Sequence, residues 1–145
     1  MFCRSRLLAK WTNKGLSHVA FATKDINKTV ALFKEKFKIE DIIEPFEFSP
    51  QKVKVAFLHL GDSSIEVIEP LAADSPITKF LDKNPNGGMH HVCFYVDDLA
   101  NAIEDLKAEG VRALNKPRPG ALGKDVVFMH PKDTGGVLVE LEEHK

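Results

Sequence analysis

The segment His18-Val19-Ala20-Phe21-Ala22-Thr23-Lys24-Asp25 has a counterpart in the second half of the chain, His91-Val92-Cys93-Phe94-Tyr95-Val96-Asp97-Asp98. The two segments start 73 residues apart, and each runs from a histidine through strand-forming residues to an aspartate seven places later. Glu66 in Ile65-Glu66-Val67 and Glu140 in Val139-Glu140-Leu141 form a second matched pair, 74 residues apart. A fixed spacing of this kind indicates two copies of one supersecondary unit.

Each copy predicts a strand, a helix and three further strands. Asp25 and Asp98 are suited to cap the two helices, because a carboxylate at the N-cap accepts a hydrogen bond from a free backbone N–H. The apolar and turn residues predict strands near residues 16–22, 41–46, 53–60 and 64–69 in the first copy, and near 89–96, 111–115, 125–130 and 136–142 in the second. In the joint, Ser75-Pro76 predicts the start of a short helix.

This order of elements predicts an α+β fold. We expect a single domain over residues 15–145, with one βαβββ module at about 15–70 and another at about 88–143, joined by residues 71–87. Each module has enough strands for a curved mixed sheet with its helix on the outer face.

Strand alternation places the two histidines and two glutamates on one face. Alternate residues of a strand share a face, so packing of Val19 and Phe21 under the first helix leaves His18 facing away. The same argument turns three further side chains to the concave face, those of Glu66, His91 and Glu140. The sequence therefore predicts a metal site built from these four residues.

The ligand set of two imidazoles and two carboxylates suits a first-row divalent ion and is poor for calcium. We expect one such ion, Co2+ or Mn2+ first and Ni2+ or Zn2+ next. Four protein ligands leave two positions of an octahedral shell for a chelating substrate, whereas a three-ligand site leaves three for substrate and dioxygen. The fourth ligand therefore favours Lewis-acid chemistry without a redox step.

Three other histidines lie near these segments. His90 has the opposite parity to His91, which predicts a supporting or purely structural role. His59 and His130 occupy similar places in the third strands of the two copies, where contact with a substrate and a structural role are equally consistent with the sequence.

The N-terminal residues 1–14 differ in composition from the rest. They are basic and amphipathic, with no acidic residue and with Arg4, Arg6, Lys10, Lys14, Phe2, Leu7, Leu8 and Trp11. Such a head is typical of mitochondrial targeting, which predicts the matrix, with the cytoplasm as the alternative. A basic tail or a lead-in to the first strand explains the same residues.

Composition excludes several other classes. The net charge of −1 gives no electrostatic case for nucleic acid, and the apolar runs are too short to cross a membrane. The two cysteines, Cys3 in the head and Cys93 within a strand, do not suggest a disulfide.

The whole pattern resembles the vicinal oxygen chelate superfamily, and within it the methylmalonyl-CoA epimerase family, over roughly residues 15–143. The segments that carry the resemblance are Leu16-Ser17-His18-Val19-Ala20, Asp74-Ser75-Pro76-Ile77, Gly87-Gly88-Met89-His90-His91-Val92, Gly120-Ala121-Leu122-Gly123-Lys124, His130-Pro131-Lys132-Asp133 and Gly135-Gly136-Val137-Leu138-Val139-Glu140-Leu141. The segments around Ser75, His90 and Lys132 are the most specific to the epimerases.

The resemblance implies interconversion of (R)- and (S)-methylmalonyl-CoA in propionyl-CoA catabolism, by proton abstraction and return at the carbon alpha to the thioester. It implies His18, Glu66, His91 and Glu140 as ligands of the metal ion that assists the reaction, and a homodimer. Epimerisation needs an acid or base on each side of that carbon, and Glu140 is the first choice for one of them.

The second acid or base is open. Where some family members have a glutamate on the third strand, this chain has Val55, so Glu66, Lys54, a metal-bound water or a further residue takes the role. Lys132 and Lys124 are the expected substrate contacts, to the carboxylate or the CoA phosphates. The alternatives within the superfamily are glyoxalase I, an extradiol-type dioxygenase and a binding module of the bleomycin-resistance type, and outside these an epimerase of another acyl-CoA.

Overall fold

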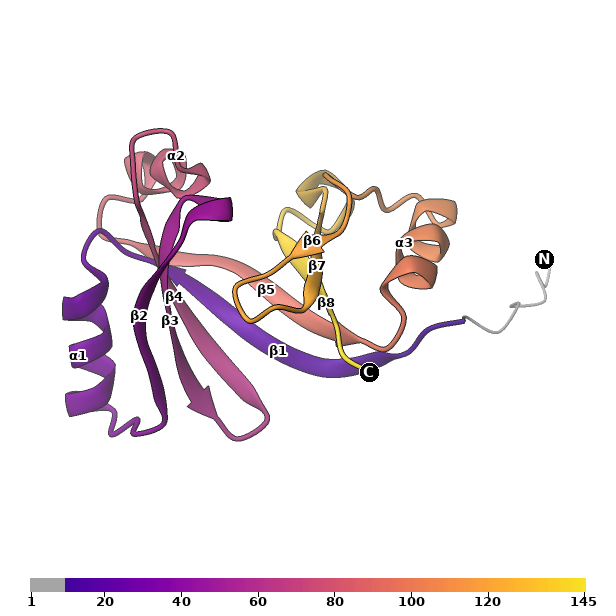
Figure 1. The fold of residues 1–145 in the computed structure, drawn as a ribbon. Coiled ribbons are helices and arrows are strands. Elements are labelled where there is room, and N and C mark those ends of the chain that lie inside the picture. The colour runs from indigo at the N-terminus through magenta and orange to yellow at the C-terminus, as the bar shows by residue number, and fades with distance from the viewer. Residues whose placement is uncertain (1–9) are drawn as a thin grey trace. The chain divides into compact units, whose positions relative to one another are not determined.

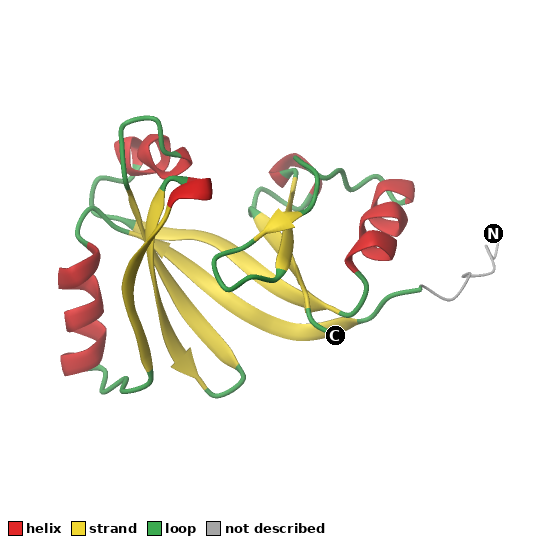
Figure 2. Ribbon diagram, in the orientation of Figure 1, coloured by secondary structure: helices red, strands yellow, loops and turns green. Residues whose placement is uncertain are grey.

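The structure is a computed structural model that describes residues 10–145, so the greater part of the predicted basic head lies outside the described residues. The chain divides into two compact units (Figure 1). The first comprises Leu16–Cys93, and the second comprises Phe94–Lys145 with residues 10–15. Both units combine strands with helices, which confirms the predicted α+β class (Figure 2).

The first unit is built on five hydrogen-bonded strands in the order β2-β3-β4-β1-β5. Its elements are β1 (Asn13–Ala22), α1 (Ile26–Lys36), β2 (Ile42–Phe48), the 3-10 turn η1 (Ser49–Gln51), β3 (Val53–Leu60), β4 (Ser63–Pro70), α2 (Pro76–Lys83) and the first part of β5 (Gly88–Val96). Strands β1 and β4 run parallel and β2, β3 and β4 are antiparallel neighbours, so the sheet is mixed as expected.

Helix α1 covers one face of this sheet. The helix begins where predicted, because Asp25 accepts a hydrogen bond from the Lys28 N–H at 3.1 Å. Ile26 and Val30 pack with buried residues of β3 and β4 in one apolar cluster. Ala56, Leu58 and Val67 belong to that cluster, which shows that their side chains face α1 and that the residues between them face away.

The second unit has the same plan with fewer strands. Its elements are α3 (Leu99–Ala108), β6 (Arg118–Pro119), β7 (Asp125–Met129), the 3-10 turn η2 (Pro131–Asp133) and β8 (Val139–Glu143), with β8, β7 and β6 as successive neighbours. Leu99 and Ala102 of α3 pack against Val127, Met129 and Leu141. Asp98 caps α3 by accepting from the Asn101 N–H at 3.0 Å, as predicted.

The two modules share a further contact, a hydrogen bond between the first N–H group of the helix and a strand glutamate. The Ile26 N–H donates to Glu69 at 3.2 Å, and the Leu99 N–H donates to Glu143 at 3.4 Å. Each glutamate lies three positions after a predicted ligand glutamate, so strand alternation sends it to the opposite, helix-bearing face. A carboxylate at a helix N-terminus is stabilising because it meets unpaired N–H groups and the positive end of the helix dipole.

The prediction of a regular strand over residues 111–115 in the second unit is wrong. Residues 111–115 run beside β7 but make only an isolated bridge, Ala113 with Met129. The regular pattern stops because the side chain of Asn115, through Oδ1, accepts the Phe128 N–H at 3.3 Å in place of a backbone carbonyl. The short strand β6 lies instead within the predicted loop of residues 117–123, and β8 starts later than predicted, at Val139.

The described end of the N-terminal head packs within the second unit. The indole Nε1 of Trp11 donates to Asp105 at 2.9 Å, and Trp11 packs against the apolar cluster under α3. Thr12 and Asp97 exchange two hydrogen bonds, one through the Asp97 carboxylate at 2.6 Å and one between backbone groups at 3.2 Å. The boundary at residue 15 remains a prediction, but residues 11 and 12 contribute contacts to the folded chain.

Candidate metal centre

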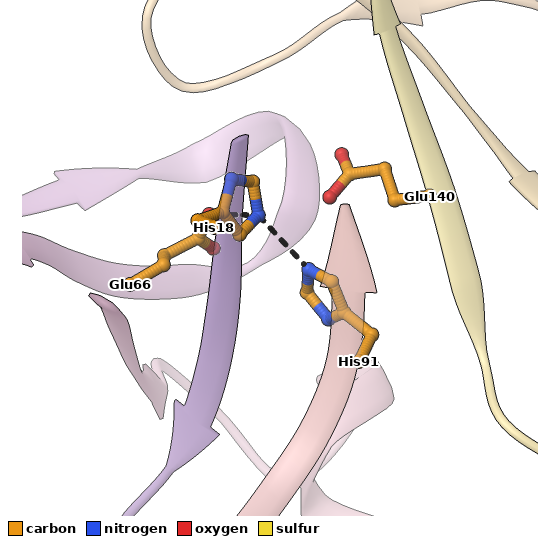
Figure 3. Close-up of side chains that lie close together, drawn as sticks. All are labelled: His18, Glu66, His91 and Glu140. Carbon is orange, nitrogen blue, oxygen red and sulfur yellow. Dashed lines mark hydrogen bonds and ion pairs between the residues drawn. The ribbon is translucent and has the colours of Figure 1, made fainter. Parts of the chain in front are cut away.

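Three of the four predicted ligands converge inside the first unit. His18 lies on β1, Glu66 on β4 and His91 on β5, and both β4 and β5 are neighbours of β1. The Nε2 atom of His18 lies 2.9 Å from Oε2 of Glu66 and 3.3 Å from Nε2 of His91 (Figure 3). All three side chains are buried, with at most 9% of each residue exposed.

These distances fit ligands of one metal ion. Metal–ligand bonds of about 2.1 Å place neighbouring ligand atoms about 3.0 Å apart in an octahedral shell and about 3.4 Å apart in a tetrahedral one. The separations of 2.9 and 3.3 Å fall at these values. Buried imidazole nitrogens and a carboxylate are also the donors that first-row divalent ions prefer. The cluster is therefore able to hold a divalent metal ion.

Strand alternation within the first unit agrees with the sequence prediction. The ring of Phe57 meets the ring of His18 edge-on at 6.3 Å, which places Phe57 on the ligand face of β3. Its Cα partner on β4 is Glu66. Phe21, predicted to face the helix, contacts Phe33 of α1 at 5.7 Å. The ligand face and the helix face are thus distinct, as the spacing of residues indicated.

The residue before each predicted ligand histidine contacts that histidine's Nδ1 atom. The hydroxyl of Ser17 lies 3.0 Å from Nδ1 of His18. Nδ1 of His90 lies 2.8 Å from Nδ1 of His91. The supporting role predicted for His90 is consistent with this contact, whereas the sequence analysis did not single out Ser17. Its position next to His18, matched to His90 at the repeat spacing, was the available signal.

Gly87 sets the start of β5 close to the end of β1. Its φ angle is +80°, and a Cβ atom built on it would lie 2.6 Å from the carbonyl oxygen of Ala22. Only glycine allows this approach, because any side chain would collide with the backbone of β1. The approach is three residues from His90 and four from His91, so it helps to fix the position of β5 beside the strand that carries His18.

The fourth predicted ligand, Glu140, belongs to the second unit. It lies on β8 with 5% of its surface exposed, and its Cα partner on β7 is Phe128. The pairing of Phe57 with Glu66 has the same form, so the repeat relates the two glutamates in strand register as well as in spacing. Leu141, the next residue, packs under α3, which turns Glu140 to the face away from the helix.

The two lysines that are expected to contact the substrate are exposed, and both lie in turns of the second unit. Lys132 lies in η2, and Lys124 precedes β7. The turn of Lys132 is anchored by Asp133, whose carboxylate receives hydrogen bonds from Nε and Nη2 of Arg112 at 2.8 and 3.2 Å. These hydrogen bonds lower the pKa of Asp133 to about 2.

The two histidines with open roles, His59 and His130, both make hydrogen-bond contacts within the protein. Nδ1 of His59 lies 2.9 Å from the hydroxyl of Ser64, across β3 and β4. Nδ1 of His130 accepts the backbone N–H of Lys132 at 3.2 Å and so caps η2. Both imidazoles therefore stabilise local backbone or side-chain geometry.

The strand position where a second catalytic carboxylate was expected is apolar. Val55 is fully buried and shares the face of Phe57, two residues away. Lys54 has the opposite parity, and its ammonium lies 3.8 Å from Glu69, which also accepts the Ile26 N–H of α1. The Lys54 ammonium is thus directed to the helix face.

Comparison with known proteins identifies similar chains along nearly the whole sequence. Residues 17–128 match the model of the Glyoxalase/Bleomycin resistance protein/Dioxygenase superfamily. The mitochondrial methylmalonyl-CoA epimerase of Mus musculus is 44% identical, over 92% of this chain and 75% of its own.

Solved structures of methylmalonyl-CoA epimerases are also similar to this chain in fold. The crystal structure of methylmalonyl-CoA epimerase from Mycobacterium tuberculosis superposes with a TM-score of 0.86 at 30% identity, over 97% of this chain and 94% of its own. A methylmalonyl-CoA epimerase in complex with methylmalonyl-CoA and NH4+ superposes with a TM-score of 0.83 at 32% identity, over 91% of this chain and 95% of its own.

Proposed function

Because the chain belongs to the Glyoxalase/Bleomycin resistance protein/Dioxygenase superfamily and, within it, to the family of its methylmalonyl-CoA epimerase relatives, we propose that it interconverts (R)- and (S)-methylmalonyl-CoA. The observation that carries the proposal is the buried group of His18, Glu66 and His91 on three neighbouring strands. A relative of similar fold is known in complex with methylmalonyl-CoA.

The proposed metal ion is held by His18, Glu66, His91 and Glu140, the four residues that the internal repeat predicts as ligands. Burial, strand parity and the repeat support Glu140 as the fourth ligand. Co2+ or Mn2+ is the first choice and Ni2+ or Zn2+ the next, since these ions accept mixed imidazole and carboxylate ligands. A bound divalent ion supplies Lewis-acid stabilisation of the negative charge that develops on the substrate oxygens.

The chain's own residues supply the proton transfer. We assign Glu140 as one acid or base at the carbon alpha to the thioester, because it is a buried carboxylate on the ligand-bearing strand β8. With Lys54 directed to the helix face, Glu66 or a water molecule takes the opposite side. Substrate binding is assigned to Lys132 and Lys124, whose exposed ammonium groups suit the carboxylate or the CoA phosphates.

The remaining expectations concern the cell and the assembly. The basic head and the mitochondrial relatives support targeting to the matrix, and the fold family supports a homodimer. Among residues 10–145, no helix is long and apolar enough to cross a membrane. Light scattering of the purified protein measures its mass, and a monomer at micromolar concentration would contradict the homodimer.

The function is tested by a substrate comparison on Co2+-loaded protein. We expect (2S)-methylmalonyl-CoA to be converted to the (2R) form, read out through the stereospecific mutase, which consumes only this product epimer, and we expect chelation to abolish the conversion. The glutathione hemithioacetal of methylglyoxal serves as the comparison substrate. Turnover of the hemithioacetal without turnover of methylmalonyl-CoA would replace the proposal with a glyoxalase activity.

A further inference from the structure

Metal binding requires each ligand imidazole to present a nitrogen lone pair in a fixed direction. Nε2 of His18 and Nε2 of His91 point into the site. A neutral imidazole carries its single proton on the other nitrogen when Nε2 is the donor, so Nδ1 must be protonated and must find an acceptor. Partners of this kind usually raise metal affinity by orienting the ring and fixing its tautomer.

Both Nδ1 atoms meet such a partner in the first unit. The Ser17 hydroxyl is buried, with 4% of the residue exposed, and lies 3.0 Å from Nδ1 of His18. The imidazole of His90 lies 2.8 Å from Nδ1 of His91 through its own Nδ1. One hydroxyl and one imidazole therefore occupy equivalent places, 73 residues apart, each directly before a ligand.

We propose that Ser17 and His90 are positioning residues that hold His18 and His91 in the tautomer with Nε2 directed at the metal. In the pair of histidines, His91 donates its Nδ1 proton and His90 accepts it, so His90 carries its own proton on Nε2. In the other pair, His18 donates its Nδ1 proton to the Ser17 hydroxyl oxygen. This assignment rests on the proposed metal centre and extends it to residues that do not bind the ion.

Helix α2 takes part in this arrangement through Phe80. The ring of Phe80 meets the ring of His90 edge-on, with centroids 5.1 Å apart and planes at 83°. The edge of His90 is thereby fixed while its Nδ1 faces His91. The helix itself starts at a buried N-cap, Ser75, whose hydroxyl accepts the Ile77 N–H at 3.3 Å. The connecting segment between the two modules thus supports one of the ligands.

The chain offers a matched control for Ser17. Ser64 makes the same kind of contact, hydroxyl to imidazole Nδ1 at 2.9 Å, with His59 in the same unit. Ser17→Ala and Ser64→Ala each remove one such contact, but only the first touches a ligand. We expect similar losses of thermal stability from the two variants and a loss of metal affinity from Ser17→Ala alone.

The measurement is the Zn2+ affinity of the full-length protein, obtained by competition with a chromophoric chelator. We expect Ser17→Ala to bind Zn2+ roughly 10- to 100-fold more weakly, the usual effect of removing such a partner. His90→Phe keeps a ring against Phe80 but lacks the acceptor, and it should show a comparable loss. His90→Asn restores an acceptor oxygen at the place of Nδ1 and should recover most of the affinity.

A second readout follows the proton directly. In 15N-labelled, Zn2+-loaded protein, long-range imidazole NMR spectra should show the proton of His18 and of His91 on Nδ1, and that of His90 on Nε2. Ser17→Ala should change the Nδ1–H signal of His18 and leave that of His91 in place. Protonation of His90 on Nδ1 in the loaded wild type would overturn the assignment, since the imidazole could not then accept from His91.

The outcomes separate this inference from the function on which it rests. If wild type binds Zn2+ and the Ser17→Ala and His90→Phe variants bind it equally well, the positioning role is wrong and the metal centre stands. If wild type binds neither Zn2+ nor Co2+, the metal centre is wrong and the positioning role falls with it.

Discussion

Replacing Gly87 by alanine should weaken both the fold and the metal site, because this residue fixes the start of β5. Two costs combine. A non-glycine residue in the left-handed region costs roughly 1–2 kcal/mol. The added Cβ would also lie 2.6 Å from the Ala22 carbonyl oxygen, closer than real Cβ contacts, and forced overpacking of this kind costs about 1–3 kcal/mol. The two together give about 2–5 kcal/mol.

Gly110 provides the control for the conformational part of this cost. Its φ is +87°, close to the +80° of Gly87, but a Cβ built on it meets nothing within 4 Å. Gly110→Ala should therefore lose only the roughly 1–2 kcal/mol of backbone strain. The difference between the two variants, about 1–3 kcal/mol, isolates the collision with β1.

Equilibrium unfolding in urea, with calorimetry as a second probe, measures these differences. For a chain of this size each kcal/mol shifts Tm by roughly 2–4 °C, so Gly87→Ala should melt about 2–12 °C below Gly110→Ala. Relief of the collision moves β5 away from β1, and Zn2+ affinity should fall in Gly87→Ala alone. Equal stabilities and equal Zn2+ affinities in the two variants would refute the close approach as the element that positions His91.

Three further changes test other parts of the structure. Glu140→Gln should reduce turnover far more than metal content, because the amide no longer accepts a proton; a parallel fall of the two, by metal analysis and kinetics, would leave Glu140 a ligand only. Removing residues 1–14 should destabilise the chain by up to roughly 3 kcal/mol, because the partly buried ring of Trp11 no longer packs against the cluster under α3, whereas an unchanged Tm would show that the head adds nothing. The lowered pKa of Asp133, about 2, means that its stabilising contribution is present above pH 4 and is lost as the pH falls toward 2. Arg112→Gln should therefore flatten the dependence of Tm on pH in that window, and identical slopes would contradict the contact.

Much of the fold was predictable because its signals are local. The caps at Asp25, Asp98 and Ser75 depend only on residues one to three positions away, and all three helices begin at the residues predicted. Strand alternation also placed Glu66 opposite to Val67 correctly, because a two-residue period leaves no other choice.

The contacts that were not predicted connect residues distant in sequence. Glu69 accepts the first N–H of α1, and Glu143 accepts the first N–H of α3. These two hydrogen bonds depend on where the ends of β4 and β8 lie, which no local sequence pattern contains. The break in the strand predicted near residue 113 arises because the Asn115 side chain replaces a backbone acceptor for β7. Secondary-structure propensities of single residues do not include this competition between a side chain and the backbone for one hydrogen bond.

The features of the site likewise fall into those that the sequence predicts and those that it does not. The four ligand candidates were visible from spacing and parity, because both are properties of a repeated strand. The contact between Ser17 and His18 could not be predicted from the sequence, since a serine beside a histidine has many conformations and few of them bring its hydroxyl to 3.0 Å from Nδ1. The apolar character of Val55 was visible in the sequence, and the structure adds that this position is fully buried on the ligand face.

A divalent ion in the proposed site should allow the chain to exchange the proton alpha to the thioester. The most direct measurement incubates Co2+-loaded and chelator-treated protein with (2R)-methylmalonyl-CoA in deuterium oxide and follows the C2 proton signal by NMR. We expect rapid loss of that signal, with appearance of the (2S) epimer, in the loaded sample alone. Retention of the C2 proton at the uncatalysed rate, in protein shown to contain the metal, would contradict the proposed function.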